Sequence, residues 1–299
     1  MNVGRAATLR LWIRELRVHQ WLKNLLIFVP LLASHRIDRG GVLLEGVLAF
    51  LLFNFCASSA YILNDLVDLP HDRLHPYRSQ RPFASGRLEA KTGFWVFPLL
   101  LLGALAVAYW LLPAVFAAAL AVYFVITTAY SLVLKRFIVI DVVTLAMLYT
   151  LRILAGALLF HLVATFWMLA FSNFIFLSLA LAKRYTELCS ARSRGDAEQA
   201  HGRGYEQQDL GMIAAFGAAS GCISVLVLAL YIQDQNTTVL YRHPQIIWLA
   251  CPLLMFWILR VWMVTHRGRM YDDPVVFAAR DIPSLIVGAL FGLVFWLAA

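Results

Sequence analysis

The sequence predicts an all-α membrane protein with several spanning helices, and three observations support this fold class. Hydrophobic residues make up 62% of the 299 positions, only 14% of positions are charged, and the mean hydropathy is +0.75. An ordinary soluble domain is about 25% charged, and a soluble chain of this length could not bury so much apolar surface in one core. Apolar runs of about 18 residues or more recur along the chain, which is typical of spanning helices and not of barrel strands.

Nine segments are predicted to cross the membrane, in a single domain that covers residues 1–299. The first is short and contains Pro30, so we expect it to bend or to begin at the interface. The third and fourth are separated only by Leu112 and Pro113, which predicts a tight turn. The nine predicted spans are 21–35, 42–64, 93–111, 113–134, 137–160, 163–182, 211–232, 245–265 and 282–298.

The basic residues predict the orientation of these spans. Twenty of the 25 Lys and Arg lie in the N-terminal tail through Lys23 and in every second connection, and only Arg36, Arg39 and Arg242 lie in the opposite connections. Because basic connections stay in the cytoplasm, we expect a cytoplasmic N-terminus and an external C-terminus. The net charge of +8 fits anionic membrane lipids or a phosphorylated substrate, and not nucleic acid, because the charge lies in short connections between apolar spans.

An acidic motif ends the second predicted span, with Asn64 and Asp65 followed by Asp68 and Asp72. Offsets of three and seven residues place the three carboxylates within about 60° of one helical face. Crowded carboxylates repel one another unless a positive group lies between them, and a hard cation such as Mg²⁺ with a diphosphate meets this need. Pro70 predicts that the helix kinks or unwinds here, so that Asp72 approaches from a loop.

The alternative interpretation is a solvated helix end whose acids pair with Arg73, Arg78 and Arg81. We favour the metal site because ionisable groups directly at a membrane span usually mark function. The catalytic and metal-binding residues predicted on this basis are Asp65, Asp68 and Asp72.

This motif, together with nine predicted spans, resembles the UbiA superfamily of intramembrane prenyltransferases. The segment from Arg17 to Asn24, and Tyr130 with Lys135 at the end of the fourth span, contribute to the resemblance. It implies a helical bundle with an active-site cavity that faces the cytoplasm, Mg²⁺ as cofactor, and a polyprenyl phosphate or diphosphate lipid as substrate. It also implies a location in a bacterial inner membrane, and it leaves a homo-oligomer open.

One departure indicates a branch of this superfamily. Members that prenylate aromatic acceptors carry a second Asp-x-x-x-Asp motif after the sixth span, whereas this chain has Lys183, Arg184 and Glu187 there. The stretch is similar to the decaprenyl-phosphate phosphoribosyltransferase branch, whose mycobacterial members supply cell-wall biosynthesis. This resemblance implies transfer of a phosphoribosyl group from phosphoribosyl pyrophosphate to a polyprenyl phosphate. Prenyl transfer to an aromatic or other acceptor is the alternative, and a non-catalytic lipid transporter is a more distant one.

Both substrates of such a reaction are anionic, so basic side chains must offset their repulsion. Within the fifth span, Asp141 and Arg152 share a helical face but lie about 16 Å apart along the axis, too far to pair. Arg152 suits a lipid phosphate, and a structural role is the alternative for both residues. The predicted substrate-binding residues are Lys23, Asn64, Arg81, Tyr130, Lys135, Asp141, Arg152, Lys183, Arg184 and Glu187.

Overall fold

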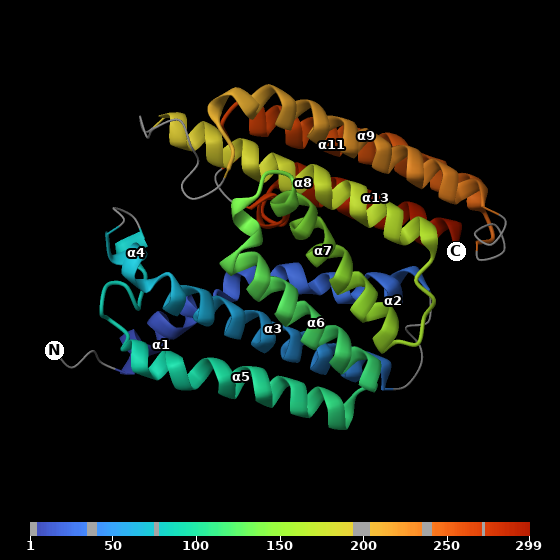
Figure 1. The fold of residues 1–299 in the computed structure, drawn as a ribbon. Helices are drawn as coiled ribbons and strands as arrows, with labels where there is room; N and C mark the ends of the chain where they lie inside the picture. Colours follow the sequence, from blue (N-terminus) through green and yellow to red (C-terminus); the bar gives the residue numbers. More distant parts are fainter. Residues whose placement is uncertain (1–4, 35–40, 75–77, 194–203, 235–240, 271–272) are drawn as a thin grey trace. The chain divides into compact units, whose positions relative to one another are not determined.

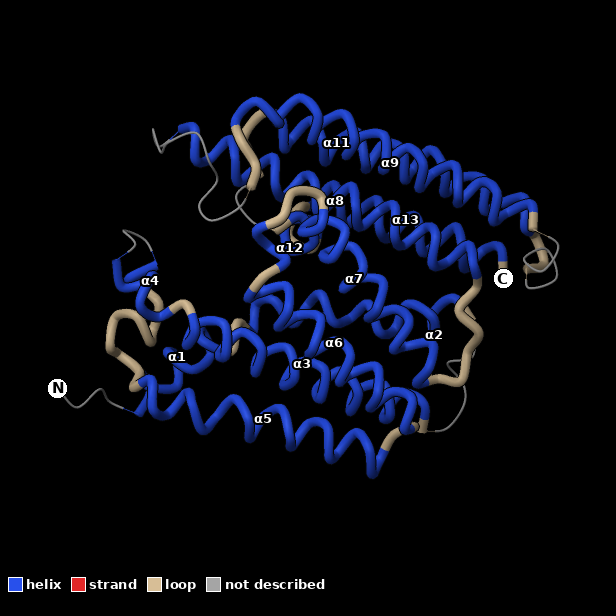
Figure 2. The backbone as a smooth tube through the Cα atoms, in the orientation of Figure 1, coloured by secondary structure: helices blue, strands red, loops and turns tan. Residues whose placement is uncertain are grey.

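The computed structural model describes residues 5–34, 41–74, 78–193, 204–234, 241–270 and 273–299, and every regular element in these ranges is a helix (Figures 1 and 2). The predicted all-α class is therefore confirmed. The chain divides into two compact units. Unit 1 comprises Met1–Leu132 and Leu151–Val163, and unit 2 comprises Val133–Thr150 and Ala164–Ala299. The boundary between them falls inside helix α7, Ile140–Leu159.

Unit 1 is built around α3, which packs against α5, α6 and the 3₁₀ helix η1. Figure 1 shows α3 and α5 side by side along their length. The core of the unit includes Phe53, Phe116 and Leu120, all fully buried. Its elements before α7 are α1 (Arg5–Glu15), η1 (Val18–Phe28), α2 (Val29–Ala33), α3 (Val42–Val67), α4 (Leu69–Leu74), η2 (Arg78–Gln80), α5 (Ala90–Leu111) and α6 (Ala114–Leu132).

The first predicted span is a 3₁₀ helix that continues into a short α-helix. Pro30 is the second residue of α2, a position where its missing N–H removes no helical hydrogen bond. A 3₁₀ helix rises about 2.0 Å per residue against about 1.5 Å for an α-helix, so η1 and α2 together measure about 30 Å along their axes. This is close to the thickness of the hydrocarbon core of a bilayer, about 30 Å. Wider spacing per residue thus compensates for a short segment.

Unit 2 is held together by close packing of α8, α9 and α11. A Cβ atom on Gly217 of α9 would lie 2.0 Å from the Trp262 ring of α11, so only glycine permits this approach. Ser178 of α8 donates a hydrogen bond to the Gly217 carbonyl at 2.7 Å and accepts one from Trp262 Nε1 at 3.0 Å. Besides the start of α7, the elements are η3 (Leu134–Arg136), α8 (Phe166–Ser193), η4 (Gln207–Asp209), α9 (Leu210–Gln233), η5 (Pro244–Leu249), α11 (Ala250–His266), α12 (Pro274–Ala278) and α13 (Ile282–Ala298).

Seven helices in the described ranges are long and apolar enough to cross a membrane, so the chain is an integral membrane protein. They coincide with the second to eighth predicted spans. The first and ninth predicted spans fall on the shorter apolar helices Val18–Ala33 and Ile282–Ala298. Nine crossings and a cytoplasmic N-terminus stay predictions. The seven are Val42–Val67, Ala90–Leu111, Ala114–Leu132, Ile140–Leu159, Phe166–Arg192, Gln207–Gln233 and Pro244–His266.

Candidate active site

The acidic motif lies across a break between two helices. Helix α3 ends at Val67, Asp68 caps it, and α4 begins at Leu69 with Pro70 in its second position. The carbonyl of Asp68 accepts hydrogen bonds from the backbone N–H groups of His71 and Asp72 at 3.0 and 2.9 Å. The interruption predicted from Pro70 is confirmed, but Asp72 lies in the short helix α4 and not in a loop. The prediction that one continuous helix presents the three acids on a single face is wrong, because α3 ends before Asp68 and Asp72 lies in the separate helix α4.

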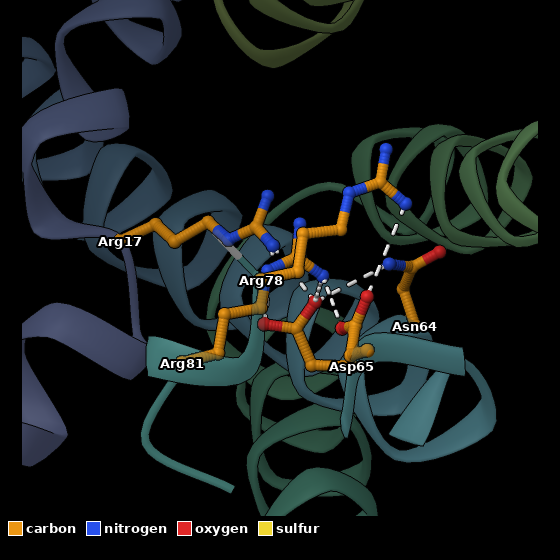
Figure 3. Close-up of polar contacts among 6 residues, drawn as sticks. Arg17, Asn64, Asp65, Arg78 and Arg81 are labelled. Carbon is orange, nitrogen blue, oxygen red and sulfur yellow. Dashed lines mark hydrogen bonds and ion pairs between the residues drawn. The ribbon is translucent and has the colours of Figure 1, made fainter. Parts of the chain in front are cut away.

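Asp65 and Asp72 nevertheless meet, because one arginine joins them. Their side chains come from α3 and α4, and these residues are only 4% and 1% exposed. Arg81 Nη1 donates to Asp65 Oδ1 at 3.0 Å and to Asp72 Oδ2 at 2.6 Å. Arg78 Nη1 lies 3.9 Å from Asp72 Oδ1, and Asn64 Nδ2 donates to Asp65 Oδ1 at 3.3 Å. Figure 3 shows these arginines gathered around the acids.

The ion pairs expected under the alternative interpretation are therefore present for Arg78 and Arg81. The solvated helix end of that interpretation is not formed at Asp65 and Asp72, which are buried. Burial strengthens each charge interaction and makes an unbalanced charge costly. Asp68, the third acid of the motif, is half-buried.

Arg17 also belongs to the candidate site. The sequence analysis named it only as the first residue of a segment that resembles the superfamily, and predicted no role for it. Its Nη2 donates to both oxygens of Asp65, at 2.8 and 3.1 Å (Figure 3). Its guanidinium lies 4.6 Å from the centre of the Tyr61 ring. Its backbone φ is 51°, in the left-handed region that non-glycine residues seldom adopt. Arg17 forms the turn between α1 and η1, and its contacts with Asp65 and Tyr61 offset the cost of this strained conformation.

Glu15 is a site residue that the sequence analysis missed altogether. It is the last residue of α1 and only 2% exposed. Burial raises the pKa of Glu15 to about 8, helped by the negative charge of Asp65 and by a side-chain hydrogen bond with it, against the opposing charges of Arg17 and Arg81. Leu11 and Trp12, one turn before Glu15, pack against the core cluster of Ile62, Phe83 and Leu88, and this apolar spacing is the signal in the sequence that could have indicated its burial.

The carboxylates are chemically suited to a hard divalent cation, although a guanidinium lies between two of them. In the described ranges, no three His, Cys, Asp or Glu side chains are close enough to hold a metal as they stand. Oδ1 of Asp72 is buried without a hydrogen-bond partner, 3.9 Å from Arg78 Nη1. Carboxylate oxygens are the ligands that Mg²⁺ prefers, so the chemistry of these side chains suits Mg²⁺, whereas their present arrangement, with Arg81 bonded to both Asp65 and Asp72, leaves no place for it. The predicted magnesium site stays a prediction.

A second cluster of charged residues lies in unit 2. It includes Arg184 and Glu187, from the stretch where aromatic prenyltransferases of the resembled superfamily carry a second acidic motif. Arg184 forms an ion pair with Asp141, 2.6 Å from Nε to Oδ2, and both residues are almost completely buried. Arg184 also pairs with Glu187 one turn later in α8. Tyr205 donates to Asp141 Oδ1 at 2.6 Å and accepts from the backbone N–H of Val139 at 2.9 Å. Tyr205 thereby ties the segment before η4 to the start of α7.

Lys183, the neighbour of Arg184, pairs with an acid from a distant part of unit 2. Its Nζ lies 3.1 Å from Asp273 Oδ2, and Tyr149 donates to Asp273 Oδ1 at 3.3 Å. Asp273 also accepts from the backbone N–H of Val275 and so caps α12. Lys183 and Arg184, the two residues of this stretch predicted to contact phosphate, are therefore both paired with carboxylates.

Arg152 belongs to a buried network in unit 1. Its Nε donates to Asn24 Oδ1 at 2.7 Å and its Nη2 to the Tyr123 hydroxyl at 2.8 Å, and Asn24 in turn donates to Asn54 at 2.6 Å. These contacts support the structural alternative for Arg152, because they fasten η1 to three helices.

The remaining predicted residues occupy separate places. Lys23 is buried in η1, Tyr130 is half-buried in α6, and Lys135 is half-buried in η3. The structure therefore brings together Asn64, Asp65, Asp72 and Arg81 in unit 1, and Asp141, Arg184 and Glu187 in unit 2.

Fold and clusters together define a helical integral membrane protein with buried acid–base groups at helix ends. The model of the UbiA prenyltransferase family matches residues 25–277, so the chain belongs to this family, whose members are transferases. An Archaeoglobus fulgidus UbiA homologue solved with GPP and Mg²⁺ bound has the same fold, with a TM-score of 0.69 over 96% of this chain and 99% of that chain, at 17% identity.

Three curated relatives cover most of this chain. An uncharacterized protein y4nM of Sinorhizobium fredii is 38% identical over 96% of the chain, which spans 55% of that relative's length. The nodulation protein NoeC of Azorhizobium caulinodans is 37% identical over 93% of the chain and 91% of its own length. Decaprenyl-phosphate phosphoribosyltransferase of Mycolicibacterium smegmatis is 27% identical over 90% of the chain and 86% of its own length.

Proposed function

We propose that the protein transfers a 5-phosphoribosyl group from phosphoribosyl pyrophosphate to a polyprenyl phosphate in a bacterial inner membrane. The bond from the anomeric carbon to the pyrophosphate oxygen breaks, a bond to an oxygen of the lipid phosphate forms, and pyrophosphate leaves. The acidic cluster faces the cytoplasm in this proposal, as the distribution of basic residues predicts.

The observation that carries the proposal is the basic pair Lys183 and Arg184 in the stretch where aromatic prenyltransferases of the resembled superfamily have a second acid pair. Arg184 is already neutralised by Asp141 and Glu187, so this stretch is poorly suited to a second divalent cation. Lys183, whose side chain is the more exposed of the two, would contact phosphate oxygens on leaving Asp273, and Arg184 would do so only on leaving its two acids. The similarity to a mycobacterial phosphoribosyltransferase supports the same reaction.

Each residue of the acidic cluster has a role in this mechanism. Asp65, Asp68 and Asp72 would hold Mg²⁺, which when bound neutralises the developing charge on the leaving pyrophosphate. Arg81 would bind the same phosphates after leaving the two acids, and Asn64 would orient Asp65 through the hydrogen bond already present. A phosphate acceptor is ionised at neutral pH, so no general base is required.

The test is incubation of the purified protein in detergent with Mg²⁺, labelled phosphoribosyl pyrophosphate and a polyprenyl phosphate. We expect a labelled lipid whose formation ceases with EDTA and falls at least 100-fold in Asp65→Asn and Asp68→Asn. Glu89→Gln is the matched control, because Glu89 is exposed at the start of α5, and it should retain activity.

Two other outcomes would contradict the proposal. Label that moves only from a prenyl diphosphate to an aromatic acid identifies a prenyltransferase instead. Full turnover in both Asp65→Asn and Asp68→Asn contradicts the assignment of the metal to this motif.

A further inference from the structure

Three arginines of unit 1 lie closer to solvent than the acids they pair with. Asp65 and Asp72 are almost completely buried. The side chains of Arg17, Arg81 and Arg78 are 26%, 29% and 41% exposed, and Figure 3 shows them converging on these acids. A molecule that approaches from solvent therefore meets guanidinium groups before it meets a carboxylate.

Arg17 is held in one orientation by two side chains of α3. Its Nη2 donates to both oxygens of Asp65, and its guanidinium lies 4.6 Å from the centre of the Tyr61 ring. Tyr61 and Asp65 are four residues apart in one helix, so both contact Arg17 from the same helical face. Its left-handed backbone, with φ 51°, is a strained conformation of the kind that gathers at ligand sites.

These contacts use only part of each guanidinium group. A guanidinium carries five N–H donors in a planar fork. Within the described ranges, the hydrogen bonds of Arg17 come from Nη2 alone and those of Arg81 from Nη1 alone. None of the remaining donors of these two arginines is a buried atom without a partner. They are therefore open to a ligand that arrives from solvent.

The chemistry of such a ligand follows from the donors. Forked N–H groups match the oxygens of a phosphate, and these charge-assisted hydrogen bonds are stronger than neutral ones. A diphosphate group offers oxygens on two phosphorus atoms, so it can accept from more than one arginine at once. The buried acids below do not face it, because the guanidinium groups lie between.

We propose that Arg17 binds a diphosphate group of the substrate directly, beside Arg78 and Arg81 and without a metal ion. It does so through the donors that its pairing with Asp65 leaves available, and Asp65 positions it. The diphosphate then binds before the divalent cation. The inference rests on the proposed function only in taking a diphosphate as part of the substrate.

The first test asks whether pyrophosphate covers Arg17. Full-length protein in detergent with EDTA is treated with phenylglyoxal, which modifies accessible arginines, and modified peptides are measured by mass spectrometry. Excess pyrophosphate should slow the modification of Arg17 at least about fivefold and leave that of Arg14, exposed in α1, within about twofold. Equal modification of Arg17 with and without pyrophosphate overturns the inference.

The second test compares pyrophosphate affinities in EDTA by calorimetric titration. Arg17→Gln should weaken binding at least about tenfold, because charge-assisted hydrogen bonds are lost. Arg14→Gln, which removes the same charge from an exposed position, is the matched control. A loss in Arg17→Gln no larger than in Arg14→Gln overturns the inference.

A second variant covers the case in which Arg17→Gln fails to fold. Arg17→Gly removes the guanidinium, and glycine adopts φ 51° without strain, so the turn between α1 and η1 is kept. Arg17→Gly should also weaken pyrophosphate binding at least about tenfold. Unweakened binding by Arg17→Gly overturns the inference.

The outcomes separate this inference from the proposed function. Protection of Arg17 by pyrophosphate without a labelled lipid in the transfer assay supports the site and contradicts the reaction. A labelled lipid from a protein that binds no pyrophosphate in EDTA supports the reaction and overturns the inference. Displacement of bound pyrophosphate by phosphoribosyl pyrophosphate identifies the proposed donor, whereas displacement by geranyl diphosphate alone identifies a prenyl donor at the same site.

Discussion

Arg184 and Asp141 form a buried ion pair within unit 2. Both were predicted as substrate-binding residues, and each is almost completely buried against the other, with Tyr205 as a further donor to Asp141. A buried ion pair contributes little net stability, but loss of one partner strands the other charge. A role in phosphate binding by Arg184 therefore requires that Asp141 keeps a donor, which Tyr205 provides.

Replacement of Arg184 by Met should lower the free energy of unfolding by about 3–5 kcal/mol, because Asp141 stays buried without its cation. Adding Asp141→Asn should recover most of this loss, since the amide keeps an acceptor for Tyr205 and carries no charge. Denaturant unfolding in detergent measures both variants, with the exposed Arg87→Met as control. A double variant no more stable than Arg184→Met would show that the loss has another cause.

At the scale of the elements, the 3₁₀ helix η1 lies in close contact with α7. Gly156 in the second half of α7 faces its backbone, and a Cβ atom on Gly156 would lie 2.0 Å from the Ile27 carbonyl oxygen. The Arg152 network fastens η1 to the same helix one turn earlier. Long 3₁₀ helices are uncommon, so these contacts with α7 supply stabilisation that the local sequence of η1 does not.

Gly156→Ala should therefore lower the free energy of unfolding by about 3 kcal/mol, because η1 or α7 must move to admit the methyl group. Gly103→Ala is the matched control, since a Cβ there meets nothing within 4 Å, and alanine is the better helix former. Thermal unfolding in detergent compares the two. Equal midpoints for Gly156→Ala and the unchanged protein would contradict the close approach of η1 and α7.

Over the whole molecule, the number of crossings depends on the two short apolar helices. Seven helices of the described residues are long and apolar enough to span a membrane. The two apolar helices Val18–Ala33 and Ile282–Ala298 are shorter than these seven. The 3₁₀ geometry of η1 extends the first to about 30 Å. The basic residues then predict that the first connection and the connection 65–92 lie on opposite sides of the membrane.

Cysteine labelling in spheroplasts tests this arrangement, in a background that lacks the four native cysteines. A membrane-impermeant maleimide should label Arg39→Cys in intact spheroplasts, whereas Arg87→Cys should react only after permeabilisation. Labelling of Arg87→Cys in intact spheroplasts would reverse the predicted orientation. Arg10→Cys, on the other side of Val18–Ala33, should likewise react only after permeabilisation, and labelling of both Arg10→Cys and Arg39→Cys in intact spheroplasts would mean that Val18–Ala33 does not cross.

The sequence alone was sufficient to predict the class of protein, the family and the acidic motif. These predictions depend on composition, on the length of apolar runs and on the order of Asp, Lys and Arg, which are local properties of the chain. Pro70 was likewise sufficient for the break between α3 and α4, since its missing N–H acts on its own helix. The partners of the charged residues required the folded chain. Arg17 and Asp65 are 48 positions apart, and Lys183 and Asp273 are 90 apart.

Only the tertiary structure revealed that Glu15 is buried, that Arg81 lies between Asp65 and Asp72, and that Tyr205 binds Asp141. The physical reason is that burial and pairing depend on which helix ends meet in space. A charged residue in a polar connection has the same local sequence whether it is solvated or enclosed.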